Sequence, residues 1–211
     1  MRWLRDNGLT IVLTAAFAFS IGAMALTGWD AHNQELSRHG SSEIGLLAYL
    51  GRGEFLSAVF ENWESEFLQM AAYVMLTAFL FQRGSAESRD PDEENEVLPL
   101  PSLKRSPGRA IARFIYAYSL GIVLALLFVA SFALHLLASL RAANEQASLH
   151  GGETQGLASY LWDTGFWFES FQNWQSEFLS TAVLVVLSIF LRFRGSPESK
   201  RVEASHSETG T

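Results

Sequence analysis

The stretch GLTIVLTAAFAFSIGAMALTGW, residues 8–29, contains no charged residue, and neither does FIYAYSLGIVLALLFVASFALHLLASL, residues 114–140. Each run exceeds the roughly 20 residues that a helix needs to cross a hydrocarbon core about 30 Å thick. A helix satisfies its own backbone hydrogen bonds, which lipid cannot do for an extended chain. The two runs therefore predict an all-α integral membrane protein.

The composition excludes several classes of function. Fifteen basic and 22 acidic residues give a net charge of −7, and no basic face for nucleic acid stands out. The chain has no cysteine, which excludes disulfides, thiolate nucleophiles and cysteine-bound zinc. We find no nucleophile paired with a base, no phosphate loop and no nucleotide motif. The sequence therefore predicts neither an enzyme nor a cofactor.

The chain contains an internal repeat. Residues 39–89 align with residues 150–200 without a gap, and 24 of the 51 aligned positions are identical. Chance would give about three identities at ordinary residue frequencies. The aligned segments share NWxSEFL, at residues 62–68 and 173–179, and RGSxES, at residues 83–88 and 194–199. We infer a tandem duplication of a unit of about 80 residues.

Each repeat is interpreted as a span, an extracytoplasmic segment and a second span. The apolar part of each second span is short, so we extend it back about 20 residues from Arg83 or Arg194, which brings Trp63 and Trp174 to the outer interface. The predicted fold is all-α, with four transmembrane helices as two parallel tandem repeats of two spans each and short interfacial helices in the outer loops. The spans cover about residues 8–29, 60–82, 114–137 and 171–193.

The basic residues predict the orientation. Twelve of the fifteen Lys and Arg residues fall on one side of the predicted membrane, while Arg38, Arg52 and Arg141 fall on the other. Because positive charge is retained in the cytoplasm, we expect both termini to be cytoplasmic. The first apolar run resembles a signal peptide, but it is long for one, and its equivalent in the second repeat cannot be a signal. We therefore interpret it as a span.

The polar segments complete the predicted domain organisation. Residues 90–113 contain four of the five prolines and an acidic run at residues 90–96, which predicts a solvated cytoplasmic linker. The last residues, 201–211, are rich in Ser, Glu and Thr, and we expect a disordered tail. The first repeat then covers residues 1–89 and the second covers residues 114–200.

The second span of each repeat carries polar side chains on one helical face. A carboxylate even at the edge of hydrocarbon is costly, so we expect this face to meet the bundle interior, a water-filled cavity or a partner subunit. The candidate ligand-binding residues on this face come in three equivalent pairs: Glu66 and Glu177, Asn62 and Asn173, and Ser65 and Ser176.

Two interpretations of these residues stay open. In the functional one, the two glutamates lie near a pseudo-twofold axis and bind a cation or a proton. In the structural one, which we favour, the acidic groups complement the start of a helix while Ser and Asn hydrogen-bond between helices. The structural interpretation is favoured because the glutamates are expected near the interface and not at mid-depth.

The histidines give no prediction of a metal site. His39 and His150 occupy equivalent positions, each before a glycine in an outer loop, but neither has a close second ligand at helical spacing. His135 aligns with Met24, so it offers no symmetric pair. We therefore predict no metal.

With NWxSEFL and RGSxES both doubled, the chain resembles a family of uncharacterised bacterial membrane proteins, a domain of unknown function. The resemblance implies a bacterial inner-membrane location and brings no activity, cofactor or catalytic residue. We expect a multi-pass protein that is structural or part of a membrane complex. Its expected partners are the lipid bilayer and either further copies of itself or other membrane proteins. The alternatives are a small oligomeric cation or proton channel or carrier that uses Glu66 and Glu177, and an enzyme that acts on lipid.

Overall fold

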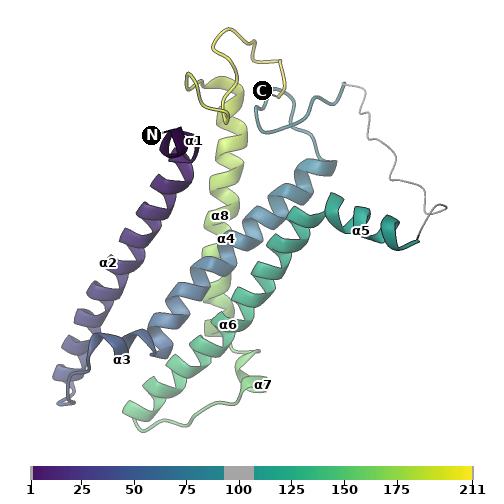
Figure 1. Ribbon diagram of the computed structural model, residues 1–211. Coiled ribbons are helices and arrows are strands. Elements are labelled where there is room, and N and C mark those ends of the chain that lie inside the picture. Colours follow the sequence, from purple (N-terminus) through teal and green to yellow (C-terminus); the bar gives the residue numbers. More distant parts are fainter. Residues whose placement is uncertain (1, 93–106, 211) are drawn as a thin grey trace. The chain divides into compact units, whose positions relative to one another are not determined.

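The computed structural model describes residues 2–92 and 107–210, and every regular element in these residues is a helix (Figure 1). The all-α prediction is thereby confirmed for this part of the chain. Two pairs of long helices alternate with four short ones. The helices are α1 Arg2–Asp6, α2 Gly8–Arg38, α3 Leu46–Leu50, α4 Gly53–Phe79, α5 Pro107–Ala117, α6 Ser119–Leu149, α7 Leu157–Tyr160 and α8 Thr164–Phe190.

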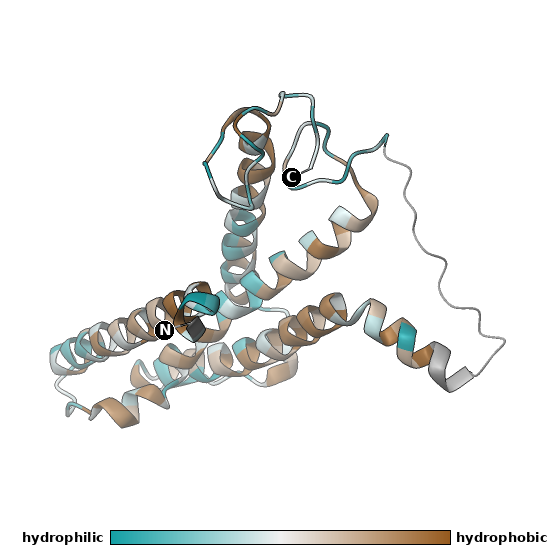
Figure 2. Ribbon diagram, turned by 45° about the horizontal axis from the view of Figure 1, so that its top comes forward, coloured by the Kyte–Doolittle hydropathy of each residue, from teal (hydrophilic) through white to brown (hydrophobic). Residues whose placement is uncertain are grey.

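Helices α2 and α6 are the most apolar elements. Each has 31 residues, and each is long and apolar enough to cross a membrane by length and composition. None of the most apolar window of α2 is buried within the protein, and only 11% of that of α6 is. Figure 2 shows their N-terminal halves as largely hydrophobic. These two exposed apolar helices are compatible with a membrane protein.

Helices α4 and α8 differ from the predicted second spans in where they begin. Both have 27 residues, and both begin seven residues earlier than expected, at Gly53 and Thr164. The start of α8 is fixed by Asp163, whose side chain accepts hydrogen bonds from the backbone N–H groups of Gly165 and Phe166. The early starts shorten the predicted interfacial helices to α3 and α7, which have five and four residues.

The chain forms two compact units that do not follow the chain order. The first unit contains Met1–Val59 and Leu134–Tyr160, and the second contains Phe60–Ala133 and Leu161–Thr211. Helices α4 and α6 therefore contribute their two ends to different units.

In the first unit, two asparagines fasten the loops that follow α2 and α6. Asn33 donates to the carbonyl of Ile44 at 3.0 Å and accepts from its N–H at 2.9 Å. Asn144 makes the same pair of hydrogen bonds with Gln155, at 3.0 and 2.7 Å. Each side chain thus replaces a backbone partner for a residue eleven positions later, which holds both loops against their helices.

Close packing in the first unit depends on two glycines. A Cβ atom at Gly28 of α2 would lie 2.3 Å from the hydroxyl oxygen of Tyr49, a buried residue of α3. A Cβ atom at Gly53 would lie 2.4 Å from the backbone nitrogen of Ala142 in α6. At Gly53 the nearby atoms are backbone, so only glycine fits there, whereas a larger residue at Gly28 would have to displace the Tyr49 ring.

In the second unit, the C-terminal segment folds back through hydrogen bonds to Lys200. The ammonium group of Lys200 donates to the carbonyls of Ser205, His206 and Glu208 at 3.1, 3.2 and 2.8 Å. This side chain is only 2% exposed, and burial lowers its pKa. A buried ammonium needs several acceptors, and the turns of residues 201–210 supply them.

The predicted linker, residues 90–113, is described only in part. Residues 93–106 lie outside the described residues, and α5 begins at Pro107. Proline suits the first position of a helix because its missing N–H would have no partner there. The end of the predicted linker is therefore helical.

Candidate functional site

Polar side chains join α4 to α8 along the second unit. Glu61 accepts a hydrogen bond from the side-chain amide of Asn173. The indole N–H of Trp174 donates to a carboxylate oxygen of Glu64 at 3.0 Å. Further along, the Gln69 amide donates to the Thr181 hydroxyl. We call these six residues the polar seam. Its contacts ascend both helices in the same order, so α4 and α8 run parallel.

Glu64 is the most deeply buried member of the polar seam. Its exposed fraction is 0%, and that of its neighbour Ser65 is 2%. A carboxylate removed from water to this degree is costly unless it is hydrogen-bonded. The Trp174 indole supplies one such bond, so the two side chains depend on each other.

Aromatic rings set the direction of the Trp174 N–H. The rings of Phe128, Trp167 and Phe171 lie 6.2, 6.3 and 5.4 Å from the indole, each steeply inclined to it. Edge-to-face contacts of this kind favour particular ring orientations. The indole is therefore held by packing while its N–H faces Glu64.

The predicted ligand-binding residues are only partly brought together. Glu66 is exposed and Glu177 is half-buried, and the two carboxylates lie close enough for their charges to repel. Asn62 is exposed, whereas Asn173 belongs to the polar seam.

The two predicted serines bond within their own helices. Ser65 donates to the carbonyl of Asn62 at 2.9 Å, and Ser176 donates to the carbonyl of Asn173 at 2.8 Å. A hydroxyl engaged three residues back along its helix is satisfied locally. Ligand binding by the six predicted residues stays a prediction.

Sequence reasoning missed Glu61 and Glu64. It selected residues present in both NWxSEFL motifs, and the equivalents of these glutamates are Gln172 and Gln175. A helical-wheel search for acidic residues at i and i+3, without the requirement of duplication, would have found them.

The RGSxES segments form turns after the long helices. Gly84 and Gly195 have φ angles of +87° and +88°, in the left-handed region that favours glycine. Because α4 ends at Phe79, Gly84 lies in a separate turn and does not cap the helix directly. The fully buried Ser85 contacts the hydroxyl of Ser188 at 2.9 Å, which fastens this turn to α8.

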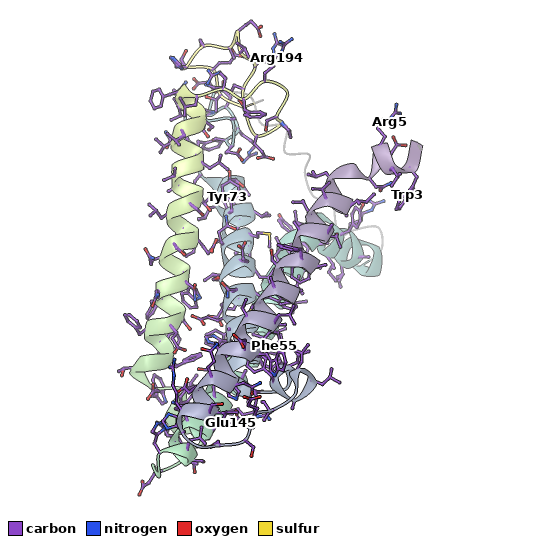
Figure 3. The ribbon with its side chains drawn as sticks, turned by 90° about the vertical axis from the view of Figure 1, so that its left-hand side faces the viewer. Trp3, Arg5, Phe55, Tyr73, Glu145 and Arg194 are labelled. Atoms are coloured by element: carbon purple, nitrogen blue, oxygen red, sulfur yellow. The ribbon has the colours of Figure 1, made fainter. Side chains whose placement is uncertain are left out.

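A carboxyl pair lies beside the first of these turns. The hydroxyl of Tyr73, labelled in Figure 3, donates to one oxygen of Glu87 at 2.8 Å. The other oxygen of Glu87 is buried, and the Glu198 carboxyl lies near Glu87. Burial raises the pKa of Glu87, the Tyr73 hydrogen bond opposes that rise, and Glu198 adds to it. Burial and the nearby Glu198 carboxyl thus both favour the protonated form of Glu87.

Within residues 2–92 and 107–210, no group of three or more His, Cys, Asp or Glu side chains could hold a metal ion.

Comparison with known proteins gives a family for the chain. A family model described as a domain of unknown function, DUF6766, matches residues 1–211. The chain belongs to the DUF6766 family. The predicted resemblance to a family of unknown function is thereby confirmed. No curated protein matches the chain, and no solved structure matches it. The DUF6766 description names no reaction, ligand or partner, so the function rests on the geometry.

Proposed function

We propose that this DUF6766 protein is a non-enzymatic four-span protein of the bacterial inner membrane, structural or part of a membrane complex, with both termini cytoplasmic. The observation that carries the proposal is the polar seam between α4 and α8. The first halves of these helices are too polar to face lipid alone, and the seam gives their polar groups partners within the protein. A paired α4 and α8 can therefore cross a membrane, as α2 and α6 can by their apolar composition.

The seam also supports the proposed tandem repeat. Its three contacts join residues 112, 110 and 112 positions apart, so each joins positions that nearly coincide when the two repeats are aligned. In two parallel helices related by a twofold axis, equivalent positions face each other. Helices α2 and α6 begin and end at aligned positions, and so do α4 and α8. We infer two parallel repeats related by a pseudo-twofold axis along the membrane normal.

The absence of cysteine allows a clean topology test, in which single cysteines are labelled with a membrane-impermeant maleimide in intact cells. The informative variants are Asp92→Cys and Thr154→Cys. With four spans, Thr154→Cys is labelled from outside and Asp92→Cys only after permeabilisation. If α2 and α6 alone cross the membrane, Asp92→Cys is labelled from outside and Thr154→Cys only after permeabilisation. Ser42→Cys, which is labelled from outside in both topologies, is the control.

The carboxylates of Glu66 and Glu177 favour a second candidate function, a small oligomeric cation or proton channel or carrier. Their mutual repulsion would be relieved by a bound cation or a proton. Four spans leave little room for a pathway, so this function also needs a dimer or a larger oligomer.

Flux measurements in proteoliposomes decide between the two functions. The comparison is between the wild type and the Glu66→Gln, Glu177→Gln double variant, with Glu35→Gln as the exposed control. Flux of protons or common cations that only the double variant abolishes, without unfolding, supports the channel or carrier. A silent wild type supports the structural role.

A further inference from the structure

Two equivalent histidines meet in the first unit. His39 follows α2, and His150 follows α6 at the aligned position of the second repeat. Each precedes a glycine in the left-handed conformation, Gly40 with φ +68° and Gly151 with φ +69°. The two imidazole rings lie 5.4 Å apart between centroids at an interplanar angle of 82°, and both residues are exposed. The loops thus place two nitrogen ligands side by side at the surface.

This spacing fits two ligands of one tetrahedral metal ion. An imidazole nitrogen lies about 2.0–2.1 Å from Zn²⁺, which puts the ring centre roughly 3.2 Å from the metal. Two such rings at a tetrahedral angle of about 109° have centres about 5.2 Å apart. The observed separation of 5.4 Å between ring centres is close to that value.

The proton on His150 is placed as a metal ligand requires. Its Nδ1 lies 3.0 Å from the backbone carbonyl of Gln146. A carbonyl oxygen can only accept, so Nδ1 carries the proton and Nε2 keeps its lone pair. Histidines that bind metals nearly always donate their other N–H in this way, often to a backbone carbonyl.

We propose that His39 and His150 form a two-histidine site for a divalent transition-metal ion such as Zn²⁺, with water in the remaining positions. The sequence predicts no metal here because the two ligands belong to different repeats and neither has a second ligand at helical spacing. Two protein ligands make an open site and not a closed structural one. The ion would join the ends of α2 and α6.

The test is calorimetric titration of Zn²⁺ into the full chain, purified in detergent without a histidine tag. We expect binding of a single ion, weakened about tenfold or more by His39→Gln and equally by His150→Gln. The matched control is His206→Gln. His206 is also exposed with Nδ1 3.1 Å from a backbone carbonyl, that of Ile189, but it has no histidine beside it among the described residues. Unchanged affinity in either test variant, or an equal loss in His206→Gln, would overturn the proposal.

Electron paramagnetic resonance of the Cu²⁺-loaded wild type gives an answer that does not depend on any variant. Two bound imidazoles split the copper signal through two nitrogen nuclei, which is the expected result. A spectrum with one nitrogen or none means that the rings only pack against each other, and it overturns the proposal.

Discussion

The two NWxSEFL motifs have nearly the same sequence but different environments. In the first, residues 62–68, Glu64 is completely buried. In the second, residues 173–179, its equivalent Gln175 is exposed. The tryptophans differ as well: Trp63 is 36% exposed, whereas Trp174 is packed among aromatic rings and hydrogen-bonded to Glu64.

This difference shows how a pair of similar helices can share one interface. Where two similar helices face each other, the interface is close-packed and has room for one of two equivalent side chains. The other then lies outside the interface. The buried carboxylate therefore occurs at a position where the two motifs differ in sequence. The shared residues Glu66 and Glu177 lie outside the polar seam.

Removing the buried carboxylate of Glu64 should cause the largest loss of stability, and removing its equivalent, Gln175, should cause little. We expect Glu64→Ala to lower the free energy of unfolding by about 2–3 kcal/mol, because a buried charge-assisted hydrogen bond and its packing are lost. Gln175→Ala should change it by less than about 0.5 kcal/mol, since that side chain is exposed. Equilibrium unfolding of the detergent-solubilised protein measures both. Equal effects would mean that the two motifs are equivalent after all.

A double-mutant cycle can isolate the bond itself. Trp174→Phe keeps an aromatic ring in the cluster and removes the N–H donor. If the bond matters, the cost of Glu64→Ala should be smaller in the Trp174→Phe background than in the wild type. Strict additivity would assign the effect of Glu64 to packing alone.

The second-largest effect on stability should come from replacing the glycines of the two RGSxES segments with alanine, and it should differ between them. Alanine in the left-handed region costs about 1–2 kcal/mol at either position. At Gly84 a Cβ atom would also lie 2.5 Å from the carbonyl oxygen of His206, whereas at Gly195 it would meet nothing within 4 Å. We expect Gly84→Ala to be the more destabilising change and to expose the C-terminal segment to trypsin. The matched digest of Gly195→Ala should resemble the wild type.

The third effect is a pH dependence at the pair formed by Glu87 and Glu198. The pKa of Glu87 is raised in the folded state. The contact therefore contributes stability that is fully present below the ordinary glutamate pKa of about 4.3, and is lost as the pH rises through the raised folded pKa. The loss should not exceed about 1 kcal/mol, because Glu87 is only half-buried and its charge is screened.

Unfolding measured across this pH range should show stability falling as the pH rises. Glu198→Gln removes the like charge, so it should flatten the fall, whereas Glu203→Gln, an exposed control in the same segment, should leave it unchanged. A profile that rises with pH would contradict the assignment.

The smallest effect should come from the contact between Gln69 and Thr181 in the polar seam. Gln69 donates to Thr181, while its equivalent, Ser180, bonds to the carbonyl of Glu177 in its own helix. Interhelical hydrogen bonds in membrane proteins contribute about 0.6 kcal/mol on average. We expect Gln69→Ala to cost about that amount and Ser180→Ala to cost less. Unfolding curves of the two variants, measured under the same conditions, would resolve the difference. A larger loss of stability in Ser180→Ala than in Gln69→Ala would contradict the assignment of Gln69 to the polar seam.

Local features of the chain were predictable from its sequence. Uncharged runs indicated α2 and α6 because a long apolar helix has a plain compositional signal. These features depend on residues near one another in the chain.

Other features depend on residues far apart, and the sequence did not predict them. The burial of Glu64 follows from the face that α8 presents, about 110 residues away. The contact between His39 and His150 joins residues 111 positions apart in the chain. The early start of α8 required recognising Asp163 as a helix cap, a signal that was present and overlooked.

The bond between Trp174 and Glu64 has a consequence for biogenesis. The indole is synthesised 110 residues after the carboxylate that it contacts. At about 5–20 residues per second, α4 waits roughly 5 to 20 s for its partner helix. In the proposed topology, α4 would lack the α8 partners of Glu61 and Glu64 if it entered the lipid during this interval. The insertion machinery would then have to shelter α4 until α8 arrives, and α4 and α8 would enter the lipid together.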